Sequence, residues 1–309
     1  MSDSRPHVAV IGGGCAGLAA AAQLTENRIP VTLFEASPYL GGRARGVSWK
    51  GLCLDNGQHI LLGAYSETLR LLHLAGTDTN TDFLRIPLRL HMHGELKLSA
   101  TPGLPAPLHI FFGFLLANGL SVKERIAALR FMTWLKHRSF ELPQDQTLST
   151  LLQHQNQPTR LIRLMWEPLC LAALNTPISQ ASAQVFLNVL RDSFAAKQGD
   201  SDMLLPRRDL SSVMANPLAD YIARKGGKIR LGAPVTKLNK SRKFEIETQD
   251  GDQQLFTHVV LATSPFRLAP LLTGFPQLTN IAELVSQLDY QPIYTVYLQY
   301  PENVRLEQP

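Results

Sequence analysis

Three glycines near the amino terminus have the spacing of a loop that binds a dinucleotide. Gly12, Gly14 and Gly17 follow the apolar run 8–11, and an alanine-rich stretch comes directly after them. In a strand–turn–helix unit with this spacing, the first glycine permits a sharp turn, the second lets the backbone approach a pyrophosphate, and the third lets the helix pack on the strand. Amide groups at the start of the helix then donate hydrogen bonds to the anion. We therefore predict that Gly12, Gly14, Ala16 and Gly17 form a phosphate-binding loop.

A carboxylate stands where the second strand of such a unit would end. Glu35 follows the apolar run 31–34 and lies 23 positions after Gly12. An acidic residue at this spacing accepts hydrogen bonds from an adenosine ribose, and it repels the additional phosphate of NADP. The alternative is an ordinary βαβ unit with a surface glutamate, and we favour the nucleotide site.

Two later segments carry polar groups that could lie along the bound dinucleotide. Gly42 and Arg43 come soon after the acidic strand end, where the arginine could contact phosphate charge or could simply be solvated in a turn. Asp55, Gly57 and His59 belong to a polar turn that could line a bound ring. His59 is the candidate proton donor, and its alternative role is a structural hydrogen bond.

The composition limits the class of protein that these groups can serve. The chain has 309 residues and a net charge of +5, which allows two cores and does not indicate nucleic-acid binding. Cys15, Cys53 and Cys170 are far apart, so we expect reduced thiols in a cytoplasmic protein, with neither a disulfide framework nor a metal site. Cys15 stands where a helix terminus could lower its pKa, although a small residue filling a crowded turn explains it as well. Because an apolar strand begins within the first ten residues, we expect no signal peptide.

The elements that position these groups form a discontinuous domain. The pattern predicts an α/β chain in which residues 1–85 and 206–268 make a Rossmann-like domain. Residues 86–205 are expected to form an inserted α+β substrate domain, which residues 269–309 continue.

Several elements follow from local signals. Ser121 and Glu124 predict a capping box that opens a helix. Further predicted elements are helices over 159–174 and 182–196, a hairpin that pairs 244–248 with 255–263, and a strand over 295–300.

The apolar segment 104–120 is the candidate membrane contact. It is too short and too rich in proline and glycine to span a bilayer. It could instead dock on an anionic membrane beside the basic helix that follows, or it could be a core helix with a solvated basic face. The docking residues would be Ile110, Phe111, Phe112, Phe114, Leu115 and Leu116, and the basic ones Lys123, Arg125, Arg130, Lys136 and Arg138, against Glu124.

Together these segments resemble the FAD-dependent amine oxidase and phytoene desaturase superfamily. The segments that carry this resemblance are Gly12–Gly17, Glu35 with Gly41–Arg43, the strands around Val235, and Val259–Pro265. Within the superfamily, Leu54–Tyr65, Leu104–His109 and Trp166–Leu169 resemble the hydroxysqualene dehydroxylase family, also called squalene-associated FAD-dependent desaturases.

The resemblance implies a flavoenzyme of isoprenoid metabolism. It would use reduced FAD to remove the hydroxyl of hydroxysqualene, an apolar C30 substrate, and give squalene for hopanoid or related synthesis. Val235 would approach the adenine through its backbone, and the turn from Asp55 to His59 would lie near the isoalloxazine. The enzyme would be cytoplasmic, peripheral on the inner face of the membrane, and associated with squalene-pathway enzymes.

Other interpretations remain open at this point. A carotenoid-type desaturase would run the redox reaction in the opposite direction, and an amine oxidase would need an aromatic cage, whereas aromatic residues make up 7% of this chain. The family pattern also includes a later Gly-Asp segment over the flavin, and Gly199-Asp200 and Gly251-Asp252 stand in predicted turns of a different context. A non-catalytic chain that binds lipid or a partner enzyme is therefore the second alternative.

Overall fold

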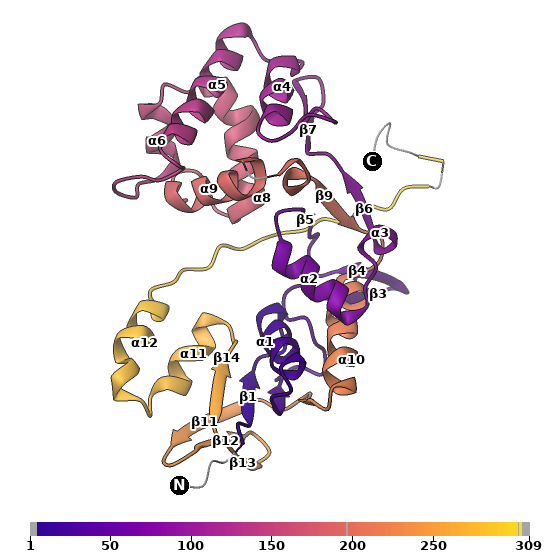
Figure 1. Cartoon of the computed structure of the whole chain (residues 1–309), viewed down its shortest axis with the longest axis vertical. Coiled ribbons are helices and arrows are strands. Elements are labelled where there is room, and N and C mark those ends of the chain that lie inside the picture. Colours follow the sequence, from indigo (N-terminus) through magenta and orange to yellow (C-terminus); the bar gives the residue numbers. More distant parts are fainter. Residues whose placement is uncertain (1–4, 196, 302, 305–309) are drawn as a thin grey trace.

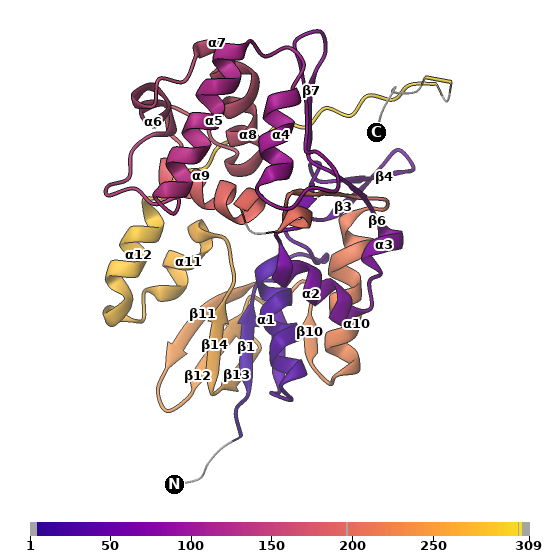
Figure 2. The ribbon, with the colours of Figure 1, turned by 45° about the horizontal axis from the view of Figure 1, so that its top comes forward.

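The computed structural model describes residues 5–195, 197–301 and 303–304. It has a parallel sheet with its covering elements at one end and a helical region at the other (Figures 1 and 2). No helix within the described ranges is long and apolar enough to cross a membrane.

Four parallel strands form the sheet that carries the glycine loop. In spatial order they are β10 (Lys228–Arg230), β2 (Val31–Phe34), β1 (Val8–Ile11) and β14 (His258–Leu261). The helix α1 (Cys15–Glu26) makes the crossover from β1 to β2. Because β1 lies between β2 and β14, its carboxyl end opens at the position where such sheets bind nucleotides. The predicted α/β class is confirmed.

Both faces of this sheet are covered, which explains why β1 is buried along its whole length. Val10 packs in a core with α1 and α10 (Asn216–Arg224), whereas Ala9 and Ile11 pack in a second core against an antiparallel sheet. That sheet consists of β11 (Val235–Lys240), β12 (Phe244–Thr248) and β13 (Gln253–Phe256).

The prediction that residues 255–263 form one strand, paired in a hairpin with 244–248, is wrong. β12 pairs with β13, and the chain then crosses to the parallel sheet, where β14 pairs with β1. Thr257 marks the crossing, because its amide and hydroxyl groups both donate to the carbonyl of His7. Phe256 is fully buried between the two sheets, so the apolar run is continuous although the strand is not.

The helical region has its own core around Trp166, which packs against Phe114 and Phe131. Its elements are β7 (Arg89–Met92), β8 (Leu96–Ser99), α4 (Leu108–Leu116), α5 (Val122–His137), α6 (Leu148–His154), α7 (Thr159–Leu161), α8 (Glu167–Leu174) and α9 (Ala183–Leu190). The two predicted long helices each contain a π-helical turn, η1 (Ile162–Trp166) and η2 (Arg191–Ala195). Pro168 lacks an amide donor and follows the first of these turns, which explains the break in the regular ladder there.

The remaining elements connect these parts. They are β3 (Gly46–Trp49), β4 (Leu52–Asp55), β5 (Leu61–Leu62), α2 (Ser66–Ala75), α3 (Thr79–Asp82), β6 (Phe83–Ile86), η3 (Gln198–Ser201), β9 (Met203–Pro206), η4 (Ser211–Ala215), α11 (Pro265–Leu272), η5 (Pro276–Leu278) and α12 (Thr279–Ser286). β5, β9 and β6 pair into a small sheet.

Two expectations about apolar segments need correction. The stretch 295–300 is not a strand, because it pairs with no described strand; Val296 within it is 78% exposed, and Tyr294 just before it is 89% exposed. On α4, Ile110 and Phe114 are not available for docking, because both are 3% exposed within the core. The capping box is confirmed, since Ser121 and Glu124 exchange hydrogen bonds at the start of α5.

Candidate functional site

The glycine loop has the steric requirements that its spacing predicted. Gly12 has φ +113°, and a Cβ there would lie 2.6 Å from the carbonyl oxygen of Ala262. A Cβ on Gly17 would lie 1.8 Å from the carbonyl oxygen of Gly12. A side chain at either position would therefore destabilise the packing of the chain itself, whether or not a cofactor is bound.

Gly14 differs from its two neighbours in the motif. Its backbone is extended, with φ −76° and ψ −175°, and a Cβ would approach only the Cα of Gly42, at 3.9 Å. Protein packing thus leaves the space above Gly14 open. Gly14 is also the N-cap of α1 and offers no side-chain acceptor, and Ala16 is exposed in the first turn. The first amides of α1 are free to bind an anion.

Glu35 is held at the end of β2 beside this loop. One carboxylate oxygen accepts a hydrogen bond from the amide of Gly13 at 2.5 Å, and the other accepts one from the amide of Ser37 at 2.8 Å. Its carbonyl oxygen accepts from the amide of Ala233. That bond brings the start of β11, with Val235, to the same edge of the sheet, as an adenosine site requires.

The 41–45 loop docks directly on the glycine loop. The amide of Gly41 donates to the carbonyl of Gly13 at 2.9 Å, and Gly42 has φ +59°. Arg43 is exposed, and its charge acts on Cys15 at the start of α1. Burial raises the pKa of Cys15 and outweighs the lowering by its own backbone amide and by Arg43, which agrees with the interpretation of Cys15 as a small residue that fills a crowded turn.

The polar turn after β4 is tied to the residue that precedes η4. Asp55 Oδ1 accepts a hydrogen bond from the amide of Leu210 at 2.7 Å, while Oδ2 has no hydrogen-bond partner among the described residues. Burial raises the pKa of Asp55, and the charge of Asp209 raises it further, against the opposing effects of Leu210 and His59. The carboxyl group of Asp55 therefore keeps its proton to a higher pH than an exposed aspartate.

His59 lies within electrostatic reach of Asp55 but is less firmly placed. It is half-buried, and no described residue forms a hydrogen bond with its ring. The side-chain amide of Asn56 donates to the carbonyl of Arg43 at 3.5 Å, and its backbone amide donates to the carbonyl of Arg45 at 2.8 Å, which joins this turn to the docked loop. Gly57 lies beside Thr295 of the extended segment.

Two residues of this region were not among the predicted site residues. Thr263 follows β14 beside Gly12, and its hydroxyl oxygen is buried with no hydrogen-bond partner in the described chain. The sequence feature that could have identified Thr263 is its position as the first polar residue after a buried parallel strand. Tyr297 donates from its hydroxyl to the carbonyl of Asp55 at 2.8 Å, a contact across 242 positions for which the sequence has no signal.

These observations fit a dinucleotide cofactor. The open space above Gly14 and the orphaned hydroxyl of Thr263 lie at the carboxyl edge of the parallel sheet, with free amides at the start of α1. Within the described ranges, no group of three or more His, Cys, Asp or Glu residues could hold a metal ion.

Comparison with known proteins agrees with this geometry. Hydroxysqualene dehydroxylases of Sinorhizobium fredii and Rhodopseudomonas palustris are 27% and 26% identical to this chain, over 91% and 95% of its length and 67% and 68% of theirs. The zeta-carotene desaturase of Zea mays is 26% identical over 72% of this chain and 42% of its own. The chain thus spans at most about two thirds of these relatives.

The fold recurs in solved structures. A crystal structure of an oxidoreductase from Methanosarcina mazei superposes with a TM-score of 0.66 at 19% identity, over 91% of this chain and 65% of that one. The family model described as flavin containing amine oxidoreductase matches residues 15–309. The chain therefore belongs to the flavin containing amine oxidoreductase family, and its cofactor is FAD.

Proposed function

We propose that this protein is an FAD-dependent oxidoreductase that removes the hydroxyl group of hydroxysqualene and releases squalene. One observation carries the proposal: two hydroxysqualene dehydroxylases align over 91% and 95% of the chain, whereas the Zea mays desaturase aligns over 72%. Alignments over 91% and 95% of the chain must include most of the helical region, which lies outside the parallel sheet and where we expect the substrate to be selected.

The residues of the glycine loop would hold the cofactor. Gly12, Gly14, Ala16 and Gly17 would surround the pyrophosphate, and Glu35 would bind the ribose. Gly42, Arg43, Asp55, Gly57 and Val235 would lie along the rest of the molecule. When bound, reduced FAD supplies two electrons and one hydrogen to the carbon that loses the hydroxyl.

The reaction also needs one proton for the leaving oxygen. The carbon–oxygen bond breaks, the oxygen takes this proton and leaves as water, and a carbon–hydrogen bond forms. Asp55 is a better candidate than His59 to hold the proton, at Oδ2. Its other oxygen is fixed by the amide of Leu210, burial raises its pKa, and His59 has no bond that orients it.

Product analysis tests the proposed substrate. Hydroxysqualene is incubated with the purified protein and chemically reduced FAD without oxygen, and the extract is examined by mass spectrometry. Squalene should accumulate with the wild-type protein and fall sharply with Asp55→Asn, which preserves the acceptor for Leu210. Unchanged hydroxysqualene in the presence of bound flavin would overturn the proposal.

A carotenoid-type desaturase is the second candidate, because zeta-carotene desaturases are also among the relatives. That reaction runs in the opposite direction, with electrons passing from the hydrocarbon to oxidised FAD. Incubation of zeta-carotene with the oxidised holoprotein distinguishes the two. A more unsaturated product, with no conversion of hydroxysqualene, would favour this candidate.

A further inference from the structure

An exposed apolar surface lies where α4 ends and α5 begins, at the end of the molecule opposite the parallel sheet (Figure 1). Leu115, Leu116, Val122 and Ile126 are 41%, 65%, 69% and 50% exposed. We call these four residues the α4–α5 corner. Exposed leucine, valine and isoleucine side chains gathered at one corner are typical of a contact with a partner or a membrane.

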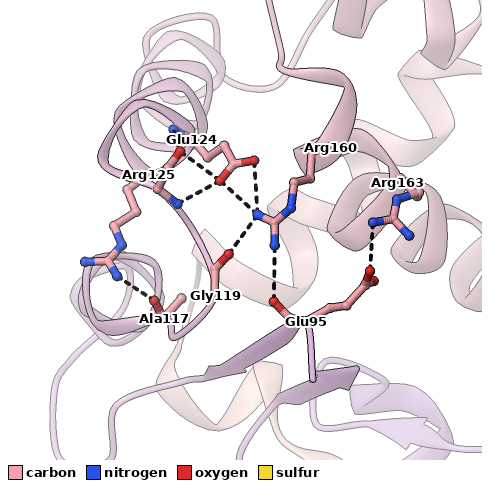
Figure 3. Close-up of polar contacts among 8 residues, drawn as sticks. Glu95, Ala117, Gly119, Glu124, Arg125, Arg160 and Arg163 are labelled. Atoms are coloured by element: carbon pink, nitrogen blue, oxygen red, sulfur yellow. Dashed lines mark hydrogen bonds and ion pairs between the residues drawn. The ribbon is translucent and has the colours of Figure 1, made fainter. Parts of the chain in front are cut away.

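Arginine side chains hold this corner in one shape (Figure 3). Arg125 donates to the carbonyl oxygens of Leu115 and Ala117 at 2.9 and 2.8 Å. Arg160 donates to the carbonyl of Gly119 at 2.8 Å and pairs with Glu124 at 3.1 Å. The exposed apolar side chains thus project from a turn in which arginines satisfy three backbone carbonyls, those of Leu115, Ala117 and Gly119, which lowers the cost of placing this backbone in an apolar phase.

The charges beside the corner identify its partner. Lys123, Arg130 and Lys136 are exposed on α5, and no described ion pair includes them. The carboxylate of Glu124 is buried and neutralised by Arg160. The solvated charge on this side of α5 is therefore positive, which complements an anionic surface.

The spacing on α5 places the apolar and basic side chains next to each other. Val122, Ile126 and Leu129 fall on one stripe of the helix, while Lys123 and Arg130 are seven residues apart along its flank. Beside them is a shallow groove, lined by Ile126, Leu129, Arg130, Thr133, Trp134 and His137. Leu129 and Trp134 also pack against the core, so the apolar side chains that α5 exposes beside its basic residues are Val122 and Ile126, and a few exposed apolar residues next to positive charge complement an anionic membrane surface.

We propose that the α4–α5 corner inserts into the surface of an anionic phospholipid bilayer. Arg125 is among the docking charges predicted from the sequence. Its guanidinium instead donates hydrogen bonds to the backbone of the corner. A protein docked in this way would meet an apolar substrate where that substrate is dissolved.

The test is sedimentation with vesicles, and it is independent of the enzyme's activity. Wild-type protein should sediment with vesicles of phosphatidylcholine and phosphatidylglycerol at low salt, and much less with phosphatidylcholine alone. The double variant Leu116→Asp, Ile126→Asp should bind at least about tenfold more weakly. Lys123→Ser with Arg130→Ser should lose about fivefold per charge and most of the salt dependence.

A matched control distinguishes binding through this surface from nonspecific binding of exposed apolar residues elsewhere on the molecule. Leu255 on β13 and Leu284 on α12 are 58% and 65% exposed, so Leu255→Asp with Leu284→Asp adds the same charge away from the corner. This control should bind as wild type does, and circular dichroism should show all variants folded. Equal binding by the corner and control variants would overturn the proposal. A wild-type protein that does not sediment with the vesicles would also overturn it. So would a corner variant that changes from dimer to monomer in solution while its vesicle binding stays that of wild type, because the corner would then be a contact between two copies of this chain.

Discussion

Substitutions to alanine at Gly14 and Gly17 separate folding from cofactor binding, although the two glycines are three residues apart. A Cβ at position 17 would lie 1.8 Å from the carbonyl oxygen of Gly12, whereas real Cβ contacts are essentially never under 3.0 Å. The helix would have to move at least 1.2 Å away from the turn. Overpacking of this kind costs about 3 kcal/mol, a large part of the stability of a typical domain.

The same change at Gly14 should leave folding almost unaffected. The backbone is already extended, and the nearest atom to a Cβ is 3.9 Å away. The weaker N-cap preference of alanine and the lower entropy of its unfolded chain oppose each other, so we expect a net change within about 1 kcal/mol. The new methyl group would occupy the space through which the pyrophosphate approaches, and the affinity for FAD should fall at least about tenfold, or about 1.4 kcal/mol.

Urea unfolding measured by tryptophan fluorescence gives the first quantity, and calorimetric titration with FAD gives the second. The reasoning predicts that Gly17→Ala lowers the free energy of unfolding and that Gly14→Ala lowers only the affinity. Equal stability of Gly17→Ala and wild type would refute the steric argument. Wild-type affinity in Gly14→Ala would refute the placement of the pyrophosphate.

Three further predictions concern charge and packing. Asp55→Asn should reduce turnover about 100-fold in product assays. Because burial raises the pKa of Asp55, the contribution of this group to the free energy of unfolding is present at low pH and is lost as pH rises through the raised pKa. Urea unfolding of the variant should lack this pH dependence. Arg160→Met should lower the free energy of unfolding by about 2 kcal/mol in urea at neutral pH, since it leaves Glu124 buried without its ion pair. Burial works against ionisation of Glu124, but hydrogen bonds from Ser121 and Arg160 hold its pKa below the ordinary value, so this stabilisation is present above that value and should disappear as pH falls through the lowered pKa. Trp166→Ala should cost about 4 kcal/mol by differential scanning calorimetry, whereas Trp166→Phe should cost much less.

The parts of the fold that depend on local sterics could be predicted from the sequence. The glycine loop, the strand ending at Glu35 and the Ser121 capping box each depend on neighbours within a few residues or one strand pair. The resemblance to the superfamily is confirmed by the family model, which matches residues 15–309.

The parts that depend on distant partners could not be predicted. An apolar run does not reveal that Phe256 lies between two sheets while Val259 joins another strand, or that Ile110 faces a core while Leu116 faces outward. The stretch 295–300 has the composition of a strand, yet strand formation needs a neighbour that supplies hydrogen bonds. The contact of Tyr297 with Asp55 is of this long-range kind as well.

Anaerobic flavin spectroscopy tests the central claim most directly. The holoprotein is reduced with dithionite, freed of excess reductant and mixed with hydroxysqualene, while the absorbance of oxidised flavin is followed with time. The account predicts that the yellow colour returns and that one squalene forms for each flavin oxidised. A reduced flavin that stays colourless beside unreacted hydroxysqualene would contradict the account.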